Sequence, residues 1–227
     1  MKISPKLGKY MADCRTFPAD AALSYQLGGM RGIWGALADR TLHRILRTGH
    51  LVVFAQLLES APEVPPPPGV AIRRLSDNDW PALSRIVTRR SLASFRILAA
   101  NGRHGLVAWR GSEAIGYGWV AEWIGPDVST YPLALPPHAA YLWDLYVVPA
   151  ERSSGVGSAL SSARVQLARR LGFREGWRMI APSNGASLRT LAKTGTDTRT
   201  VGELRFIKIF ASIHARFSPA SSGKSVA

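Results

Sequence analysis

One short stretch of the sequence, WDLYVVPAERSSGVGSAL at residues 143–160, holds the residues best suited to binding chemistry. An apolar run ends at Pro149, and Arg152, Gly155 and Gly157 follow directly. The first turn of a helix has unpaired backbone N–H groups and a partial positive charge, and glycine lets a bulky group approach the backbone. A loop of this composition in front of a helix therefore predicts a phosphate-binding site.

Two common phosphate-binding motifs do not fit this stretch. A P-loop needs a lysine and then Ser or Thr after its second glycine, whereas Ser158 and Ala159 follow Gly157. A dinucleotide-binding fingerprint needs three glycines and a later acidic residue for the ribose. Here the first glycine position holds Arg152 or Ser153, and no such acid is evident.

The elements that must position this loop follow from the apolar pattern and from capping residues. We expect strands at 70–75, 104–110, 113–123, 139–148, 176–182 and 200–210, the second and third forming a hairpin. We expect helices at 76–87, 91–100, 156–171 and 184–195. Strands that alternate with helices, with one hairpin among them, predict a mixed sheet in an α/β domain.

Composition divides the chain into four segments. They are an N-terminal extension at 1–61, a Pro-rich linker at 62–69, the main domain at 70–211 and a disordered tail at 212–227. The linker sequence is too rich in proline for a helix or a central strand. The tail ends in small and polar residues that cannot form a core.

The N-terminal extension contains a basic amphipathic pattern at 31–49, RGIWGALADRTLHRILRTG. Such a helix either packs on the domain or rests on an anionic membrane surface or an acidic protein partner. The apolar segment 51–59 is predicted to be buried, either as an added strand or as a continuation of the helix.

Charge and cysteine content limit the possible binding partners and the cellular compartment. A formal net charge of +14 attracts anionic ligands, acidic proteins, nucleic acid or anionic membranes without choosing among them. We do not expect nucleic-acid binding, because no recognition motif is present. The single Cys14 excludes an internal disulfide, and neither a secretory signal nor a bilayer-spanning apolar run is evident. We expect a cytoplasmic protein and leave a homodimer open.

Two groups of residues resemble sequence segments of the GNAT superfamily of N-acetyltransferases. The first resembles its acyl-CoA-binding motif and comprises Val147, Pro149, Arg152, Gly155 and Gly157. The second resembles a downstream segment and comprises Asn184, Ser187, Lys193 and Gly195. The resemblance extends over the order of elements from Val70 to about residue 210. It implies a mixed, mostly antiparallel twisted sheet with helices on both faces, to which the N-terminal helical extension is added.

The resemblance also implies the reaction, which is transfer of an acetyl group from acetyl-CoA to a primary amine by direct attack, with no metal. Backbone amides from about Ser153 to Ser158 would hold the diphosphate. The pantetheine arm would lie along Leu145–Val147, where a splay from the strand at 176–182 makes room. An amide near Leu145 would stabilise the oxyanion. The implied cofactor-binding residues are Leu145, Tyr146, Val147, Arg152, Ser153, Ser154, Gly155, Val156, Gly157, Ser158 and Asn184.

The acid–base residues depart from the resemblance. Family members often place a tyrosine seven residues after Asn184 to protonate the leaving thiolate, but this chain has Leu191 there. The candidate catalytic residues are Glu122, Asp144 and Tyr141, each of which could instead be an ordinary surface or strand residue. The missing tyrosine also permits a second function, a CoA-binding or regulatory module that is catalytically weak or inactive.

Two further features concern the surroundings of the site. Four arginines are expected on a solvated face, with the CoA 3′-phosphate or an acyl-carrier protein as alternative contacts: Arg164, Arg169, Arg170 and Arg174. The loops at 91–103 and 125–138 are predicted to border the acceptor. Neither the acceptor nor the acyl chain length can be read from the sequence.

Overall fold

The computed structural model describes residues 46–125, 127–129, 131, 133–194, 197–209 and 212–220. Most of the amphipathic helix predicted at 31–49 lies outside these residues. The last four residues of that segment, 46–49, begin a strand instead.

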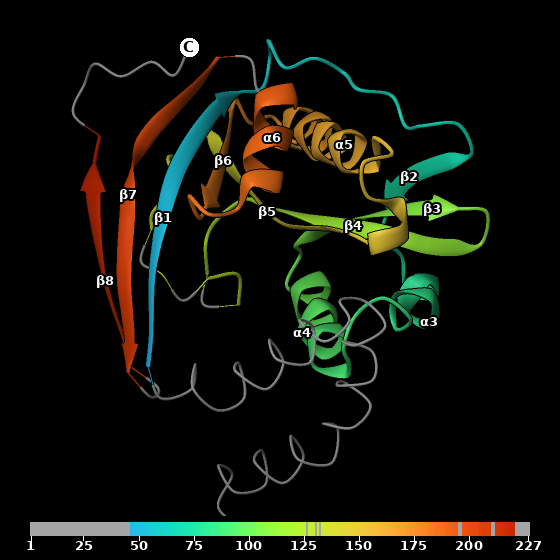
Figure 1. The fold of residues 1–227 in the computed structure, drawn as a ribbon, viewed down its shortest axis with the longest axis horizontal. Helices are drawn as coiled ribbons and strands as arrows, with labels where there is room; N and C mark the ends of the chain where they lie inside the picture. Colours follow the sequence, from blue (N-terminus) through green and yellow to red (C-terminus); the bar gives the residue numbers. More distant parts are fainter. Residues whose placement is uncertain are drawn as a thin grey trace, which may run out of the picture.

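The described residues form one eight-stranded sheet in the order β2-β3-β4-β5-β6-β1-β7-β8 (Figure 1). The strands are β1 Leu46–Leu57, β2 Val70–Arg74, β3 His104–Arg110, β4 Glu113–Ala121, β5 Ala139–Val147, β6 Glu175–Ile180, β7 Thr198–Ile209 and β8 Ser212–Pro219. Only β5 and β6 pair in parallel, whereas every other neighbouring pair is antiparallel. The prediction of a mixed, mostly antiparallel sheet is therefore confirmed.

Helices cover both faces of this sheet, with α5 and α6 on one side and α3 and α4 on the other (Figure 1). The helical segments are η1 Asp77–Asp79, α3 Trp80–Leu83, α4 Arg89–Ala100, η2 Pro149–Glu151, α5 Val156–Arg170 and α6 Gly185–Thr194. The predicted capping box is present, because the Ser76 amide donates to Asp79 Oδ2 at 2.8 Å. Thr88 caps α4 by accepting from the Ser91 amide at 3.2 Å.

The helix that follows the glycine loop packs closely on the sheet. Val156, Leu160 and Leu167 of α5 are buried in one core with residues of β3, β4 and β5. A Cβ on Gly116 of β4 would meet Leu160 Cδ1 at 3.0 Å and Tyr146 O at 2.7 Å. The missing side chain on Gly116 thus lets α5 approach β4 and β5 closely.

The sheet crosses the segment boundaries that composition predicts. β1, from the predicted N-terminal extension, lies between β6 and β7 in the sheet. The Pro-rich segment does not separate two units, because it packs along α5. Ser162 Oγ accepts a hydrogen bond from the Val64 amide at 2.9 Å and donates one to Pro62 O at 3.2 Å. Residues 62–69 therefore act as a strap across the helix.

The prediction of a disordered tail from residue 212 is also wrong over residues 212–219. These residues form β8, which pairs with β7 from Gly202 to Ile209. Phe217 packs against a buried cluster that includes Trp177 and Val53. The polar composition of the last residues concealed the alternating pattern that precedes them. Within the described part of the chain, no helix is both long and apolar enough to cross a membrane.

Candidate active site

The two parallel strands separate where the sequence predicts a splay. Backbone pairing between β5 and β6 is confined to Ala139–Tyr141 and Glu175–Trp177. Both strands continue beyond this point, β5 to Val147 and β6 to Ile180. The splay therefore opens toward the C-terminal ends of the strands, and a ligand there could pair with the β5 backbone.

A bulge lies on β5 within the same stretch. Trp143 pairs with Trp119 of β4, and Tyr146 pairs with Tyr117, so Asp144 and Leu145 together stand opposite Gly118. Asp144 has a φ of 47°, in the left-handed region that few non-glycine residues adopt. Such bulges re-aim side chains, and this one brings Asp144 to the opening of the splay.

The glycine loop lies at the open end of the splay and leaves its amides unused. Gly155 has a φ of 93° and stands directly before α5. Among the described residues, the backbone amides of Ser153–Ser158 donate no hydrogen bond, and the first bonded amide is that of Ala159, to Gly155 O at 3.0 Å. A row of free amides at a helix N-terminus fits the diphosphate of a coenzyme A molecule.

Side chains around this loop hold it in place without using those amides. Arg110 of β3 makes two hydrogen bonds to the Glu151 carboxylate, at 2.7 and 2.9 Å. Arg152 Nε donates to Val147 O at 3.2 Å, so the predicted phosphate-binding arginine also braces the loop against β5. Ser154 Oγ donates to Glu151 O at 2.6 Å. The loop is therefore preorganised for a ligand.

The two glycines of the loop have different roles. Gly155 needs its left-handed backbone, and a Cβ there would lie 3.3 Å from Pro67 Cγ. A Cβ on Gly157 would lie 3.8 Å from Val147 Cγ2, which is an ordinary contact. Because the protein's own packing does not require glycine at 157, the missing side chain leaves room for a ligand.

Asp144 combines solvent access with a low-polarity environment. The residue is exposed, yet desolvation by the surrounding protein raises the pKa of its carboxyl group to about 6. The nearby Arg164 charge and a hydrogen bond from Tyr117 partly oppose this shift. A carboxylate that is accessible and has a raised pKa can accept a proton near neutral pH.

The other two predicted catalytic residues lie elsewhere. Tyr141 is buried at the last paired position of β5, where its ring stacks on Trp143 at 5.6 Å and burial raises its pKa. Glu122 follows Ala121, the last residue of β4, and its Oε1 lies 3.4 Å from His104 Nε2. Four residues of strand, or about 13 Å, separate it from Gly118 at the bulge. The structure does not bring Glu122 to Asp144.

Two positions on the downstream segment are also placed. Asn184 caps α6, since its Oδ1 accepts from the Ser187 amide at 3.1 Å. Leu191, which stands where family members often have a tyrosine, is 5% exposed and packs into the protein interior. An apolar side chain there cannot donate a proton.

Two arginines differ from what the sequence predicts. Arg164 is buried rather than exposed, and Arg178 was not singled out at all. Arg169, Arg170 and Arg174 are exposed as predicted, but Arg164 is buried. Helical spacing gives the reason, because Arg164 lies one turn after the buried Leu160. Sequence reasoning also missed Arg178, a buried cation in a strand that reads as apolar.

The comparison with protein families agrees with this geometry. Residues 70–195 match the acetyltransferase (GNAT) family, which is more than half of the chain. The chain therefore belongs to the GNAT acetyltransferase family. No curated protein matches it.

Solved structures show the same fold at low sequence identity. A Drosophila protein is 17% identical with a TM-score of 0.56, over 78% of this chain and 57% of its own. A glucosamine N-acetyltransferase region of a fungal β-N-acetylglucosaminidase is 11% identical with a TM-score of 0.53, over 77% of this chain and 22% of its own. This chain thus spans only part of either protein. A putative acetyltransferase from Salmonella typhimurium, solved with acetyl-CoA, is 21% identical with a TM-score of 0.43, over 55% and 77% of the two chains.

Proposed function

We propose that the protein is an N-acetyltransferase that transfers the acetyl group of acetyl-CoA to a primary amine by direct attack. The observation that carries this proposal is the row of unpaired amides at Ser153–Ser158, at the mouth of the splay. Their position favours an elongated ligand with a diphosphate at one end and an arm between β5 and β6.

Different groups of the chain would orient the acetyl-CoA, stabilise the oxyanion and accept the proton of the amine. Acetyl-CoA, as co-substrate, supplies the activated acyl group as a thioester. Unpaired β5 backbone groups beyond Tyr141 would orient the arm, and the amide of Leu145 at the bulge would stabilise an oxyanion. Most amines are protonated near neutral pH, and Asp144 is the group at the bulge that can accept that proton.

An aromatic surface beside Asp144 supports an amine as the acceptor. Tyr117 and Tyr146 stack at 5.5 Å, and the half-buried Trp143 lies on the same face of the sheet, the one that α4 covers. Aromatic faces attract ammonium groups, and a carboxylate adds a full negative charge. This surface lies across the sheet from α5, so an acceptor could reach the bulge from the α4 side.

Binding is tested with Gly157→Glu and its matched control Gly157→Ala. We expect acetyl-CoA to raise the melting temperature of the wild type and of the alanine variant, since a Cβ fits at 3.8 Å from Val147 Cγ2. The glutamate should abolish the shift because it fills the phosphate space and repels the ligand. An unchanged shift in the glutamate variant would place the ligand elsewhere.

The alternative function is a CoA-binding or regulatory module with little turnover, which the buried Leu191 favours. Both functions predict binding, so turnover must decide between them. We expect free thiol to be released from acetyl-CoA when a panel of primary amines is added. Binding of acetyl-CoA without amine-dependent thiol release across the panel would favour the module.

A further inference from the structure

Two buried arginines lie near each other where β5 and β6 begin to separate. Arg178 is the first β6 residue beyond the last position that pairs with β5. Arg164 approaches from α5, on the helical layer above. Each residue is only 4% exposed, which is rare for a charged side chain.

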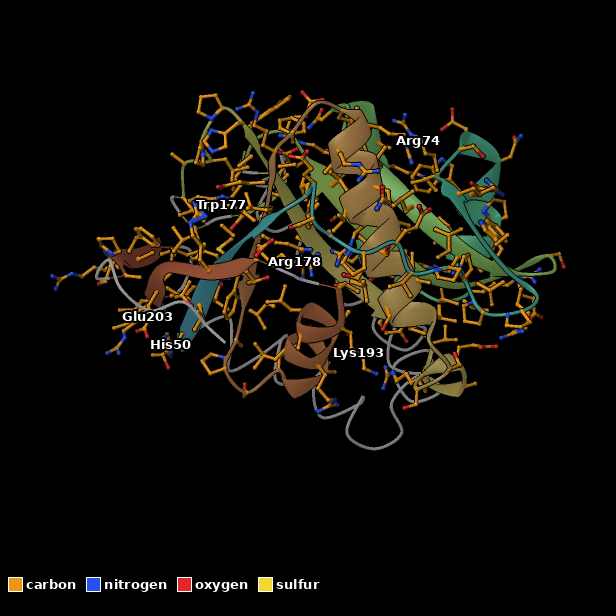
Figure 2. All side chains as sticks on the ribbon, turned by 90° about the horizontal axis from the view of Figure 1, so that it is seen from above. His50, Arg74, Trp177, Arg178, Lys193 and Glu203 are labelled. Atoms are coloured by element: carbon orange, nitrogen blue, oxygen red, sulfur yellow. The ribbon has the colours of Figure 1, made fainter. Side chains whose placement is uncertain are left out.

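Arg178 lies beneath α6, on the face of the sheet that α5 and α6 cover. Its Nη2 donates to Gln56 Oε1 of β1 at 2.9 Å, and Gln56 Nε2 donates to Thr194 O of α6 at 2.6 Å. Figure 2 draws Arg178 between α5 and α6, near the middle of the molecule. Thr194 is the last residue of α6 and lies one turn after Leu191, so Gln56 links Arg178 to the end of the helix that carries the apolar residue in place of the family's tyrosine.

Arg164 crosses β4 to reach the bulge. A Cβ on Gly118 would lie 2.8 Å from Arg164 Cδ, so the arginine occupies the space that this glycine leaves free. Its Nη1 donates to Trp143 O at 3.0 Å, one residue before Asp144. The Arg164 guanidinium therefore lies next to the bulge. That of Arg178 is held by Gln56 on the β1 side of β6, near enough to Arg164 to act on it electrostatically.

The charges around this pair do not balance. The groups that act electrostatically on Arg164 are Arg178, Asp144 and Tyr141. Among the described residues, Asp144 is the carboxylate that acts on Arg164, and none is found to act on Arg178. Glu175 of β6 is engaged with Arg199 and Trp177 instead. Burial lowers the pKa of both arginines, that of Arg178 to about 10.

The pair also keeps unused donors. In the described part of the chain, the buried Nε atoms of Arg164 and Arg178 have no hydrogen-bond partner. Burying cations without matching anions is unfavourable. The cost is offset when an anion binds or forms beside them during the reaction. Two buried arginines with unused donors therefore lie beside the splay, where the thioester of the proposed reaction would be bound.

We propose that Arg164 and Arg178 form an anion site that stabilises the departing CoA thiolate. This inference rests on the proposed acetyl transfer. The amine nitrogen bonds to the thioester carbonyl carbon, the C–S bond breaks, and its electron pair goes to sulfur. Before the attack, the ammonium proton passes to Asp144 and then to solvent. The second proton, which the nitrogen loses as the amide forms, leaves by the same route. Both guanidinium groups keep their protons and balance the sulfur charge, so no proton donor is needed at Leu191.

The direct test is the acidity of the CoA thiol in its complex with the protein. A free thiol titrates near pKa ~8.5, and two neighbouring cations should increase its acidity about tenfold or more. The ultraviolet absorbance of the thiolate reports this while free CoA is bound to the wild type. In Arg178→Met we expect the thiol to titrate close to its value in solution.

Controls separate this effect from damage to the fold. Arg205→Met removes an arginine that is 75% exposed on β7 and should leave the thiol titration unchanged. Arg178→Lys keeps a cation and should retain part of the effect. If Arg178→Met does not fold, the proposal is tested by comparing the pKa of the bound CoA thiol in Arg164→Met and in the wild type.

Three outcomes would overturn the proposal, and they differ from a failure of the proposed function. The thiol could titrate in the wild type as it does in solution, or keep its raised acidity in Arg178→Met. In the third outcome, the wild type prefers succinyl-CoA to butyryl-CoA and Arg178→Met lacks this preference, while the pKa of the bound CoA thiol stays at its value in solution. The anion would then be an acyl carboxylate. If CoA does not bind the wild type at all, the acetyl transfer itself is wrong.

Discussion

At the scale of single residues, Asp144 is the base that we propose for the reaction. A left-handed backbone and a bulge bring its carboxyl group to the opening of the splay. Desolvation raises its pKa to about 6 against the opposing charge of Arg164. A base with that pKa is ionised at neutral pH and still has useful proton affinity.

This pKa predicts how turnover depends on pH. We expect kcat/KM to rise as pH increases through about 6, because Asp144 must be ionised to accept the proton. Asp144→Asn should lower kcat by about 100-fold or more and remove this rise from the profile. Rates across pH for both proteins provide the measurement. A variant that keeps the wild-type profile would exclude Asp144 as the base.

The same pKa predicts how stability depends on pH. The pKa of Asp144 is higher in the folded chain than in the unfolded one, so its favourable contribution is complete below about pH 4 and is lost by about pH 6. Asp144→Asn has no such group. We therefore expect its melting temperature, relative to the wild type, to be higher at about pH 7 than at about pH 4. A constant difference across this range would contradict the raised pKa.

At the scale of elements, the strap at 62–69 and helix α5 together support the loop. Ser162 holds the strap through the Val64 amide and Pro62 O, and Pro67 then lies against the Gly155 position. A buried serine with two partners links a segment far away in sequence to the helix that follows the binding loop.

Ser162→Ala tests this support. It leaves the Val64 amide without its acceptor and should cost about 1 kcal/mol, which lowers the melting temperature by about 2–4 °C. Ser94→Ala is the control, because Ser94 Oγ makes only an exposed hydrogen bond to Arg90 O on α4. Equal melting temperatures for the two variants would mean that the strap contributes nothing measurable.

At the scale of the whole molecule, the sheet is larger than the family match at 70–195. β1 lies between β6 and β7, and it pairs with β7 along most of its length and with β6 over Val52–Leu57. Its Gln56 also holds Arg178 and the end of α6. The residues before the match therefore help to build the sheet and hold Arg178 in place.

We predict that a chain beginning at residue 62 does not fold alone, since β6 and β7 would expose unpaired strand edges and an open core. Circular dichroism and size-exclusion chromatography should show an aggregated or unfolded protein. A synthetic peptide of residues 46–61 should restore a cooperative melting transition. Cooperative unfolding of the shortened chain by itself would show that β1 is dispensable.

Much of this fold could be predicted from the sequence because local patterns specify local elements. Alternation predicted β2 to β7 within a few residues, and the loop before α5 was predicted from Gly155 and Gly157. The position of β1 was not predictable, because its partners are more than a hundred residues away and periodicity carries no pairing information. Arg164 was predictable from its helical spacing, whereas Arg178 becomes visible only when β1, β6 and α6 are assembled.

The most direct test of the central claim is an amide NMR titration of the full chain with CoA. We expect the amide signals of Ser153–Ser158 to shift in a saturable way, because their unpaired hydrogens bind the diphosphate. The amides of β8, at the far edge of the sheet, should not shift. CoA binding that leaves the signals of Ser153–Ser158 unchanged would show that these amides do not hold the diphosphate.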